Sequence, residues 1–454
     1  MALLARLALR RFLPDWRRPA RIVVLAFLGV IAIGTTLLML PIATTSGERA
    51  DFVSALFTAT SAVCVTGLVV VDTPTHWSAF GEIVILALVQ IGGLGIMTIA
   101  SLLGLLVSRK LGLKLQITAQ TETKTLDLGD VRRVIRGVLL VTLAFEVLVA
   151  GFLVVRFRTG YGYEWLTALY HGVFHSVTAF NNAGFALYPD NLMGFATDGW
   201  ICVPIAIAVL AGGLGFPVWV EIWRNRRGNR RWSLHTKITL VTSAVLLVIG
   251  VGVITLAEWN NPETLGGFGA GGRLVAGFFA GVMPRTAGFN SVDIGEMESG
   301  TLLVTNILMF IGGGSASTAG GIKVTTFALL AFVIYAEVRG EPSVHVMGRK
   351  LPIGTQRQAL TVALLSVGAV VAGTLLLLTL TKLRLETALF ETISAFSTVG
   401  MTTGVTTETG SWGHLVLIML MFLGRVGPIT LASALALRER SRRYELPEER
   451  PIVG

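Results

Sequence analysis

The chain has 454 residues, of which 53% are hydrophobic and only 14% are charged. An ordinary soluble domain carries about 25% charged residues, so this composition excludes a typical soluble domain and indicates a membrane protein. The formal net charge of +10 comes from basic residues in loops that membrane topology requires to be basic, so we expect no nucleic-acid partner.

Eight apolar stretches are long enough to cross a bilayer, whose hydrocarbon core requires about 20 helical residues. In chain order they cover residues 22–41, 79–107, 138–155, 201–223, 238–256, 302–335, 360–380 and 415–437. The first follows a basic segment, as in a signal peptide, but it is about 20 residues long and lacks a small-residue cleavage site. It is therefore interpreted as the first span, and an even number of spans places both termini on one side.

The Lys and Arg residues are distributed unevenly between the loops. Of the 37, 28 lie in segments 1–21, 109–136, 224–237, 339–357 and 438–450, which alternate with segments that carry one or two each. Loops rich in Lys and Arg remain on the cytoplasmic side. We therefore predict a multi-pass protein of the cell membrane with both termini in the cytoplasm.

A short segment recurs four times along the chain, and each copy places a Phe ten residues before a Gly. The pairs are Phe57 and Gly67, Phe174 and Gly184, Phe278 and Gly288, and Phe390 and Gly400. A second glycine signal follows 24 to 28 residues later, at Gly92-Gly93, Gly212-Gly213, Gly312-Gly313 and Gly424. Close packing of helices in lipid also uses small residues, but it does not account for four glycines in one register with a Phe.

The repeat predicts an all-α membrane protein in which four pore-loop repeats surround one ion pathway with pseudo-fourfold arrangement and eight transmembrane spans. Each repeat consists of a span, a half-helix with a filter loop, and a second span. The predicted parts are a cytoplasmic segment 1–21, repeats 22–110, 111–230, 231–350 and 351–437, and a cytoplasmic tail 438–454.

The residues before each repeated glycine can form only a helix of half the membrane thickness. Irregular backbone at this depth is tolerated where it lines a wet cavity, and carbonyls turned inward by glycine can replace the hydration shell of a cation. The half-helix C-termini add a partial negative charge. The predicted potassium-binding filter residues are Val65, Thr66, Gly67, Asn182, Ala183, Gly184, Thr286, Ala287, Gly288, Thr398, Val399 and Gly400.

On these four segments the sequence resembles the Trk/Ktr/HKT superfamily of potassium transporters, and the resemblance covers nearly the whole chain. In that family one glycine per repeat occupies the place of the central filter glycine of potassium channels. A serine in the first repeat accompanies sodium preference in some members, whereas Gly67 stands there in this chain. The resemblance therefore implies potassium over sodium. The first span lies close to the N-terminus, as in the Ktr-type pore subunit, whereas Trk-type relatives add two helices before it.

The stretch 302–335 is too long for one straight crossing, and its middle is rich in glycine and hydroxyls, which make a weak helix. In the family the matching segment is an intramembrane loop that obstructs the cytoplasmic route; the alternative is a close-packed helix crossing. The predicted gating residues are Gly312, Gly313, Gly314, Ser315, Ser317, Thr318, Gly320, Gly321, Lys323 and Arg425.

Two of these gating residues are cations at membrane depth, where an ionisable side chain costs about 2.5–3.5 kcal/mol and is usually functional. Lys323 follows the loop and could instead extend to the cytoplasm. Arg425 follows Gly424, which matches Gly312 in the third repeat, so we expect it to donate hydrogen bonds to the loop 312–321. The alternative is that Arg425 pairs with a lipid headgroup or with a carboxylate at a subunit interface.

Three further signals receive weaker interpretations. The G-x-G-x-x-G match at 267–272 has no preceding strand and is interpreted as a flexible external linker. His171 and His175 lack a third ligand at a matching spacing, so packing of the half-helix is favoured over a metal site. Four acidic residues flank the filter segments and either attract cations or form a solvated mouth: Asp51, Asp72, Asp190 and Asp293.

We predict that the chain is the translocating subunit of a potassium uptake system and not an enzyme, because no nucleophile with its base and no metal set stands out in the spans. The alternative is a sodium- or proton-coupled carrier. No cofactor is expected in this chain, potassium is the transported ion, and a dependence on sodium is left open. Besides membrane lipid, the resemblance implies a homodimer on a cytoplasmic ring of nucleotide-binding (RCK-type) regulatory subunits.

Overall fold

The computed structural model describes residues 19–116, 128–225 and 232–437. The predicted tail 438–454 and residues 1–18 of the predicted N-terminal segment lie outside the described residues. So do 117–127 and 226–231, which belong to two of the basic loops. The cytoplasmic placement of the termini therefore stays a prediction, as do the boundaries between the repeats.

The regular secondary structure of the described chain is almost entirely helical, and a long helix followed by a short helix occurs four times in its element order. The first set is α2 (Pro19–Leu38), η1 (Pro41–Ala43), α3 (Phe52–Val63), α4 (Thr73–His76) and α5 (Ala79–Gln116). The second set is α6 (Leu128–Tyr161), α7 (Trp165–Phe180), η2 (Met193–Phe195), α8 (Gly199–Leu214) and α9 (Phe216–Arg224).

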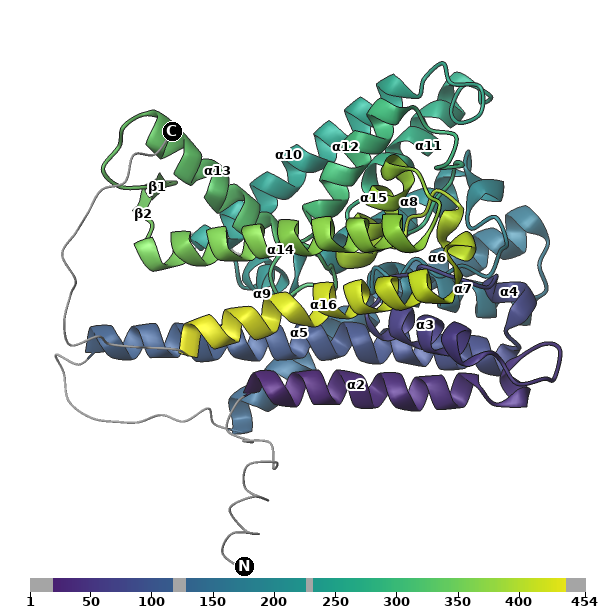
Figure 1. Cartoon of the computed structure of the whole chain (residues 1–454), viewed down its shortest axis with the longest axis horizontal. Helices are drawn as coiled ribbons and strands as arrows, with labels where there is room; N and C mark the ends of the chain where they lie inside the picture. Colours follow the sequence, from purple (N-terminus) through teal and green to yellow (C-terminus); the bar gives the residue numbers. More distant parts are fainter. Residues whose placement is uncertain (1–18, 117–127, 226–231, 438–454) are drawn as a thin grey trace, which may run out of the picture.

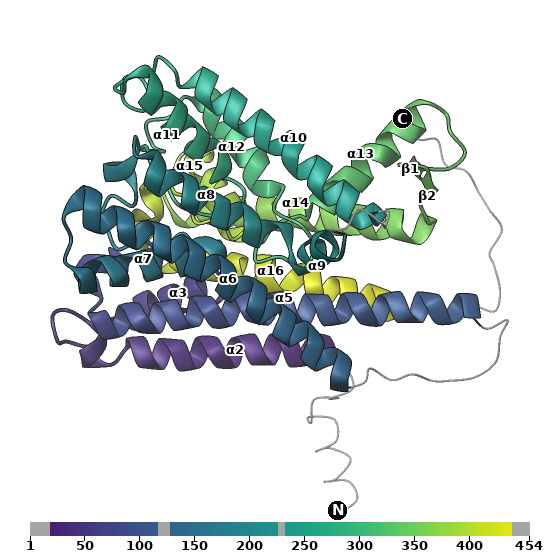
Figure 2. The same ribbon diagram turned by 180° about the vertical axis from the view of Figure 1, so that it is seen from behind.

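The third and fourth sets complete the described chain. The third is α10 (Leu234–Ala257), α11 (Ala270–Val282), α12 (Ser299–Phe310) and α13 (Val324–Val338), followed by an antiparallel hairpin of β1 (His345–Val346) and β2 (Arg349–Lys350). The fourth is α14 (Ile353–Leu380), α15 (Leu385–Phe396), η3 (Val405–Thr409) and α16 (Gly410–Leu437). In Figures 1 and 2 the long helices α2, α5, α14 and α16 lie side by side along the long axis of the molecule.

Five of the described helices are long and apolar enough to cross a membrane, which indicates a multi-pass membrane protein. They contain 79–102, 132–161, 234–257, 353–380 and 405–427. The pair α8 and α9 would be a sixth span, but it bends by 94° at Gly215, where φ is +89°. The predicted span 201–223 therefore corresponds to a bent pair of helices rather than to one straight helix, and a total of eight spans stays a prediction.

The predicted break in the stretch 302–335 is confirmed, because α12 ends at Phe310 and α13 begins at Val324. The residues between them are not helical, so the alternative of a close-packed helix crossing is wrong. Gly312 N donates to Ile322 O at 2.8 Å, and Val324 N donates to Gly313 O at 3.0 Å. These bonds fold the segment back on itself between two short helices.

The four short helices α3, α7, α11 and α15 have 12, 16, 13 and 12 residues. At 1.5 Å per residue they are about 18–24 Å long, which is less than the hydrocarbon core. Of the four repeated phenylalanines, Phe57, Phe174 and Phe390 are fully buried, whereas Phe278 is only partly buried. The C-terminal parts of the short helices therefore lie inside the bundle, whereas their first turns keep exposed apolar residues such as Leu166 and Leu274.

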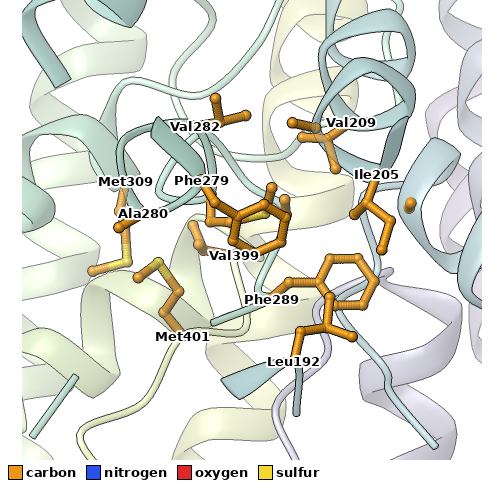
Figure 3. Packing of buried hydrophobic residues seen from close by; sticks show 14 of the residues in the cluster. Leu192, Ile205, Val209, Phe279, Ala280, Val282, Phe289, Met309, Val399 and Met401 are labelled. Carbon is orange, nitrogen blue, oxygen red and sulfur yellow. The ribbon is translucent and has the colours of Figure 1, made fainter. Parts of the chain in front are cut away.

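A large apolar core surrounds the ends of the short helices. In Figure 3 the rings of Phe279 and Phe289 lie among side chains from several elements: Leu192, Ile205, Val209, Val282, Met309, Val399 and Met401. The last helix, α16, packs on both α2 and α3. The first and last sets of helices are therefore neighbours, which closes the bundle around its interior.

Candidate functional site

The predicted filter segments follow the short helices in an unusual backbone conformation. In each segment the glycine has a φ of +67° to +93°. The residue two positions earlier also has a positive φ, of +49° to +70°, although it is not glycine: Val65, Asn182, Thr286 and Thr398. Positive φ is an outlier for β-branched residues, and such strain persists only where the surroundings impose it, typically at functional sites.

The four glycines lie against one another's segments in cyclic order. A Cβ atom built on Gly184 would lie 2.7 Å from the carbonyl oxygen of Ala287 and 2.8 Å from Gly288 Cα. A Cβ on Gly67 would collide with the carbonyl of Ala183, one on Gly288 with that of Val399, and one on Gly400 with that of Thr66. Each segment thus touches the next, and the fourth returns to the first. Glycine is required here for two reasons: it adopts a positive φ without steric cost, and there is no room for a Cβ atom beside the neighbouring segment.

Hydroxyl groups in two short helices hold the filter segments in this conformation. Ser61 Oγ accepts a hydrogen bond from Gly67 N at 3.0 Å, and Ser394 Oγ accepts one from Gly400 N at 3.1 Å. At the matching position Thr178 bonds the carbonyl of Phe174 instead, and Val282 has no hydroxyl. Sequence reasoning missed these residues, although a hydroxyl residue six positions before the glycine in three of four copies was a visible signal.

The segment 312–321 lies directly against the filter segments. The amide of Asn182, oriented with its NH2 toward Thr318, donates to Thr318 Oγ1 at 2.9 Å. Gly320 is packed against the carbonyl of Ser397 and the side chain of Thr398, and a Cβ on Gly312 would lie 3.4 Å from Thr286 Cγ2. The structure therefore brings three of the four predicted filter segments into contact with the predicted gating loop.

Both predicted gating cations donate hydrogen bonds to this loop. Arg425 is buried, with 3% of its surface exposed, and its Nη1 donates to the carbonyl of Thr318. Lys323 Nζ donates to the carbonyl of Ala319 at 2.5 Å and to that of Gly320 at 3.4 Å. The predicted contact between Arg425 and the loop is confirmed, whereas a gating role for it stays a prediction. The two cations bind three successive carbonyls.

Tight packing of α16 against α15 explains why Arg425 reaches the loop 312–321. A Cβ on Gly424 would overlap the carbonyl of Phe396, the last residue of α15. Gly424 therefore lets α16 approach the C-terminal end of the short helix, and Arg425 follows at the level of the loop. This fits the sequence alignment that matched Gly424 with Gly312.

Two buried charged residues, one in a short helix and one just after another, are not among the residues predicted from the sequence. Glu391 in α15 is fully buried and accepts hydrogen bonds from Thr402 Oγ1 at 2.5 Å and from Thr406 Oγ1 at 2.7 Å, so it holds the turn that follows the fourth filter segment. Arg285 lies three residues after the last residue of α11 and is buried. Its Nη1 donates to Ser243 O at 2.8 Å.

The weaker sequence signals have ordinary structural surroundings. The glycine-rich stretch 267–272 is only partly a linker, because α11 begins at Ala270. His175 Nδ1 lies 2.8 Å from His171 O, and its Nε2 accepts from Leu187 N at 3.3 Å. Within residues 19–116, 128–225 and 232–437, no group of three His, Cys, Asp or Glu side chains could hold a metal ion. Asp51 caps α3 by accepting from Val53 N at 2.9 Å.

The fold and these contacts define the class of the protein: a multi-pass helical membrane protein in which four glycine segments meet in the interior. The model of the TrkH family, described as cation transport protein, matches residues 8–444. The chain belongs to this family, and the resemblance inferred from its filter segments is thereby confirmed.

Several curated proteins are similar over almost their whole length. The Ktr system potassium uptake protein B of Bacillus subtilis (strain 168) is 40% identical over 93% of this chain and 94% of that protein. The protein of the same name from Vibrio alginolyticus is 39% identical over 98% of both chains. The potassium/sodium uptake protein NtpJ of Enterococcus hirae is 35% identical over 96% of this chain and 97% of that protein.

A solved structure has a similar fold. The crystal structure of the potassium transporter TrkH from Vibrio parahaemolyticus matches 91% of this chain and 83% of that chain with a TM-score of 0.69. At 18% sequence identity this likeness supports the fold alone.

Proposed function

We propose that this chain is the ion-conducting membrane subunit of a potassium uptake system. The relatives that are 39–40% identical over nearly the whole chain are potassium uptake proteins by name. The observation that carries the proposal for this chain is the cyclic contact of Gly67, Gly184, Gly288 and Gly400. A ring of four such backbone segments is the arrangement that selects a dehydrated cation by its carbonyl oxygens.

In this proposal the filter is formed by three residues from each segment, and the third of them is the glycine that, by the family resemblance, takes the place of the central filter glycine of potassium channels. Positive φ at two alternate positions turns their carbonyls to the same side of the backbone, toward the common axis. The short helices end at these segments, so their partial negative C-terminal dipoles stabilise a cation there. Glycine at all four positions favours potassium over sodium, as the family resemblance implies.

The arrangement of the membrane spans extends the proposal beyond the five or six clear candidates. We infer four pore-loop repeats and eight spans, with α8 and α9 as a bent span and α12 and α13 as a span broken by the loop 311–323. Support comes from the recurring order of long and short helices and from the contact of α16 with α2 and α3. The alternating distribution of Lys and Arg supports cytoplasmic termini.

The loop 312–321 is proposed to act as the gate. It packs against filter residues Asn182 and Thr398, and two cations bind its carbonyls. A loop in this position obstructs the pathway below the filter, and the charges of Arg425 and Lys323 add an electrostatic barrier to a leaving cation.

Deleting residues 313–320 is expected to raise potassium flux in the absence of any partner, because the deletion removes the obstruction but leaves the filter segments intact. The measurement is uptake of rubidium into proteoliposomes by the purified variant and by the parent chain. A monodisperse variant that transports less than the parent would show that the loop is not a barrier.

The partners of the chain are proposed from the family resemblance. We infer a homodimer that sits on a cytoplasmic ring of nucleotide-binding regulatory subunits, with the basic cytoplasmic loops as contact surfaces. Regulation by a nucleotide would then come from the other chain. Membrane lipid surrounds the apolar outer face, where residues such as Val147, Leu256 and Leu364 are 63–77% exposed.

A flux assay distinguishes this function from a sodium- or proton-coupled carrier. The purified chain in proteoliposomes is expected to take up rubidium, with potassium competing and sodium competing at least about tenfold less well. Uptake should follow the potassium gradient alone. Uptake that requires an inward sodium or proton gradient would favour the coupled carrier, a question raised by the potassium/sodium relative.

A further inference from the structure

A buried polar cluster lies behind the second filter segment and joins three helical elements. Its members are Gln90 of α5, Glu146 of α6 and Asn181, which follows α7. Asn181 Nδ2 lies 2.7 Å from Gln90 Oε1 and 3.3 Å from Glu146 Oε1, and Gln90 Nε2 lies 3.2 Å from Glu146 Oε2. Two amides thus donate to both oxygens of one carboxyl group.

The carboxyl group of Glu146 is buried at membrane depth, where ionising it costs free energy. The residue lies in the middle of the membrane-crossing stretch 132–161 and is 6% exposed. Among the residues that the structure describes, no Lys or Arg forms an ion pair with it. A lone carboxylate at membrane depth is expensive and usually functional, and hydrogen bonds from amides are what compensates it here. The filter and the gate, as proposed above, make no use of this group.

Asn181 connects the cluster to the second filter segment. This residue is the C-cap of α7 and directly precedes Asn182, whose φ of +58° begins the segment 182–184. Its side chain is fully buried and packs directly on Gly93 of α5. The contact is so close that a Cβ atom on Gly93 would overlap Asn181 Oδ1. Fixing the side chain of Asn181 therefore fixes the backbone from which the carbonyls of the second segment start.

The position of Asn181 is occupied differently in the other repeats. Cys64, Arg285 and Ser397 stand there. Arg285 is also tied to the first long helix of its own repeat, through Ser243 of α10. Anchoring the end of the short helix to a neighbouring long helix thus occurs twice, but only the second repeat uses a carboxyl group.

We propose that Glu146, acting through Gln90 and Asn181, is a positioning residue that sets the potassium selectivity of the second filter segment. The inference rests on the proposed function of the chain as a potassium-selective pore. Selectivity depends on the spacing and field of the filter carbonyls, so loosening one segment should admit sodium before it abolishes transport.

The arrangement allows an exchange experiment. Glu146→Gln leaves three amides and no carboxylate, whereas Gln90→Glu places two carboxylates together. The double variant carries the carboxylate at position 90 and the amide at position 146. Asn181 then again faces one carboxylate and one amide, as in the parent chain. The potassium-to-sodium flux ratio in proteoliposomes is expected to fall about fivefold or more in each single variant. It should return to within about twofold of the parent in the double variant.

Glu82→Gln is the matched control. Like Glu146, Glu82 is a buried glutamate, and it lies in α5. It accepts a hydrogen bond from Tyr170 Oη of α7 at 2.5 Å, but Tyr170 lies in the first half of α7 and not at the end that precedes the filter segment. Its substitution should leave the flux ratio unchanged. Elution from a sizing column and thermal stability, measured in potassium and in sodium, show whether each variant is folded.

Each result bears on the inference. Single variants with the parent flux ratio would overturn it, and so would a double variant no more selective than the singles or an equal loss in Glu82→Gln. If Glu146→Gln cannot be purified, Gln90→Glu and the double variant carry the same comparison. A parent chain without preference for potassium would instead contradict the proposed function.

Discussion

Gly67→Ser is expected to lower the potassium-to-sodium flux ratio by about tenfold or more while the protein remains folded. Gly67 has a φ of +88°, and a Cβ would collide with the carbonyl of Ala183 in the next segment. The neighbour is backbone and cannot rotate away, so a filter carbonyl must shift. Strain of about 1–3 kcal/mol at such a site corresponds to roughly 5- to 150-fold in an equilibrium constant. Flux of both ions in proteoliposomes measures the ratio.

Two further substitutions sharpen this prediction. Gly288→Ser, at a φ of +75°, should also lower the ratio, because its Cβ would collide with the carbonyl of Val399. Gly252→Ser in α10 is the matched control, since no heavy atom lies within 4 Å of a Cβ there. Unchanged ratios in both Gly67→Ser and Gly288→Ser would refute the assignment of the filter.

The sequence was informative where a local constraint acts. A repeated glycine in register predicted the sites of positive φ, because only glycine adopts that conformation without cost. The glycine-rich run 312–321 predicted a break between two helices, since such residues make a poor helix. The alignment of Gly424 with Gly312 predicted the contact of Arg425 with the loop. Each prediction used a backbone property that depends on the residue type.

Other features depend on packing between distant segments and could not be predicted. Positive φ at Val65 and Thr286 opposes the preference of β-branched residues and is imposed by the surrounding bundle. The carboxyl group of Glu146 meets Gln90, 56 residues earlier in the chain, only because α6 packs on α5. The bend at Gly215 had a local signal in Gly215 and Pro217, but the apolar composition of the stretch hid it.

Arg425→Ala is expected to raise basal potassium flux by about tenfold or more and to reduce the dependence on a regulatory partner. The guanidinium is buried and donates to the carbonyl of Thr318, the loop residue whose hydroxyl contacts Asn182 of the filter. A hydrogen bond to a charged group contributes about 1.5–3 kcal/mol, so losing it should shift a closed loop toward open states by roughly 10- to 150-fold. Rubidium uptake by the purified chain alone measures the change.

Intermediate variants separate the charge of Arg425 from its geometry. Arg425→Lys keeps a cation but loses the planar fork of donors, so its flux should fall between those of the parent and Arg425→Ala. Arg156→Ala is a suitable control, because Arg156 pairs with Asp198 at 2.8 Å, lies over the ring of Tyr161, and has a side chain that is 36% exposed. This variant should retain the parent flux. An Arg425→Ala protein that is folded and gates normally would mean that the contact with Thr318 supports the fold only. The barrier would then rest on the loop itself and on Lys323, whose bonds to Ala319 and Gly320 remain in that variant.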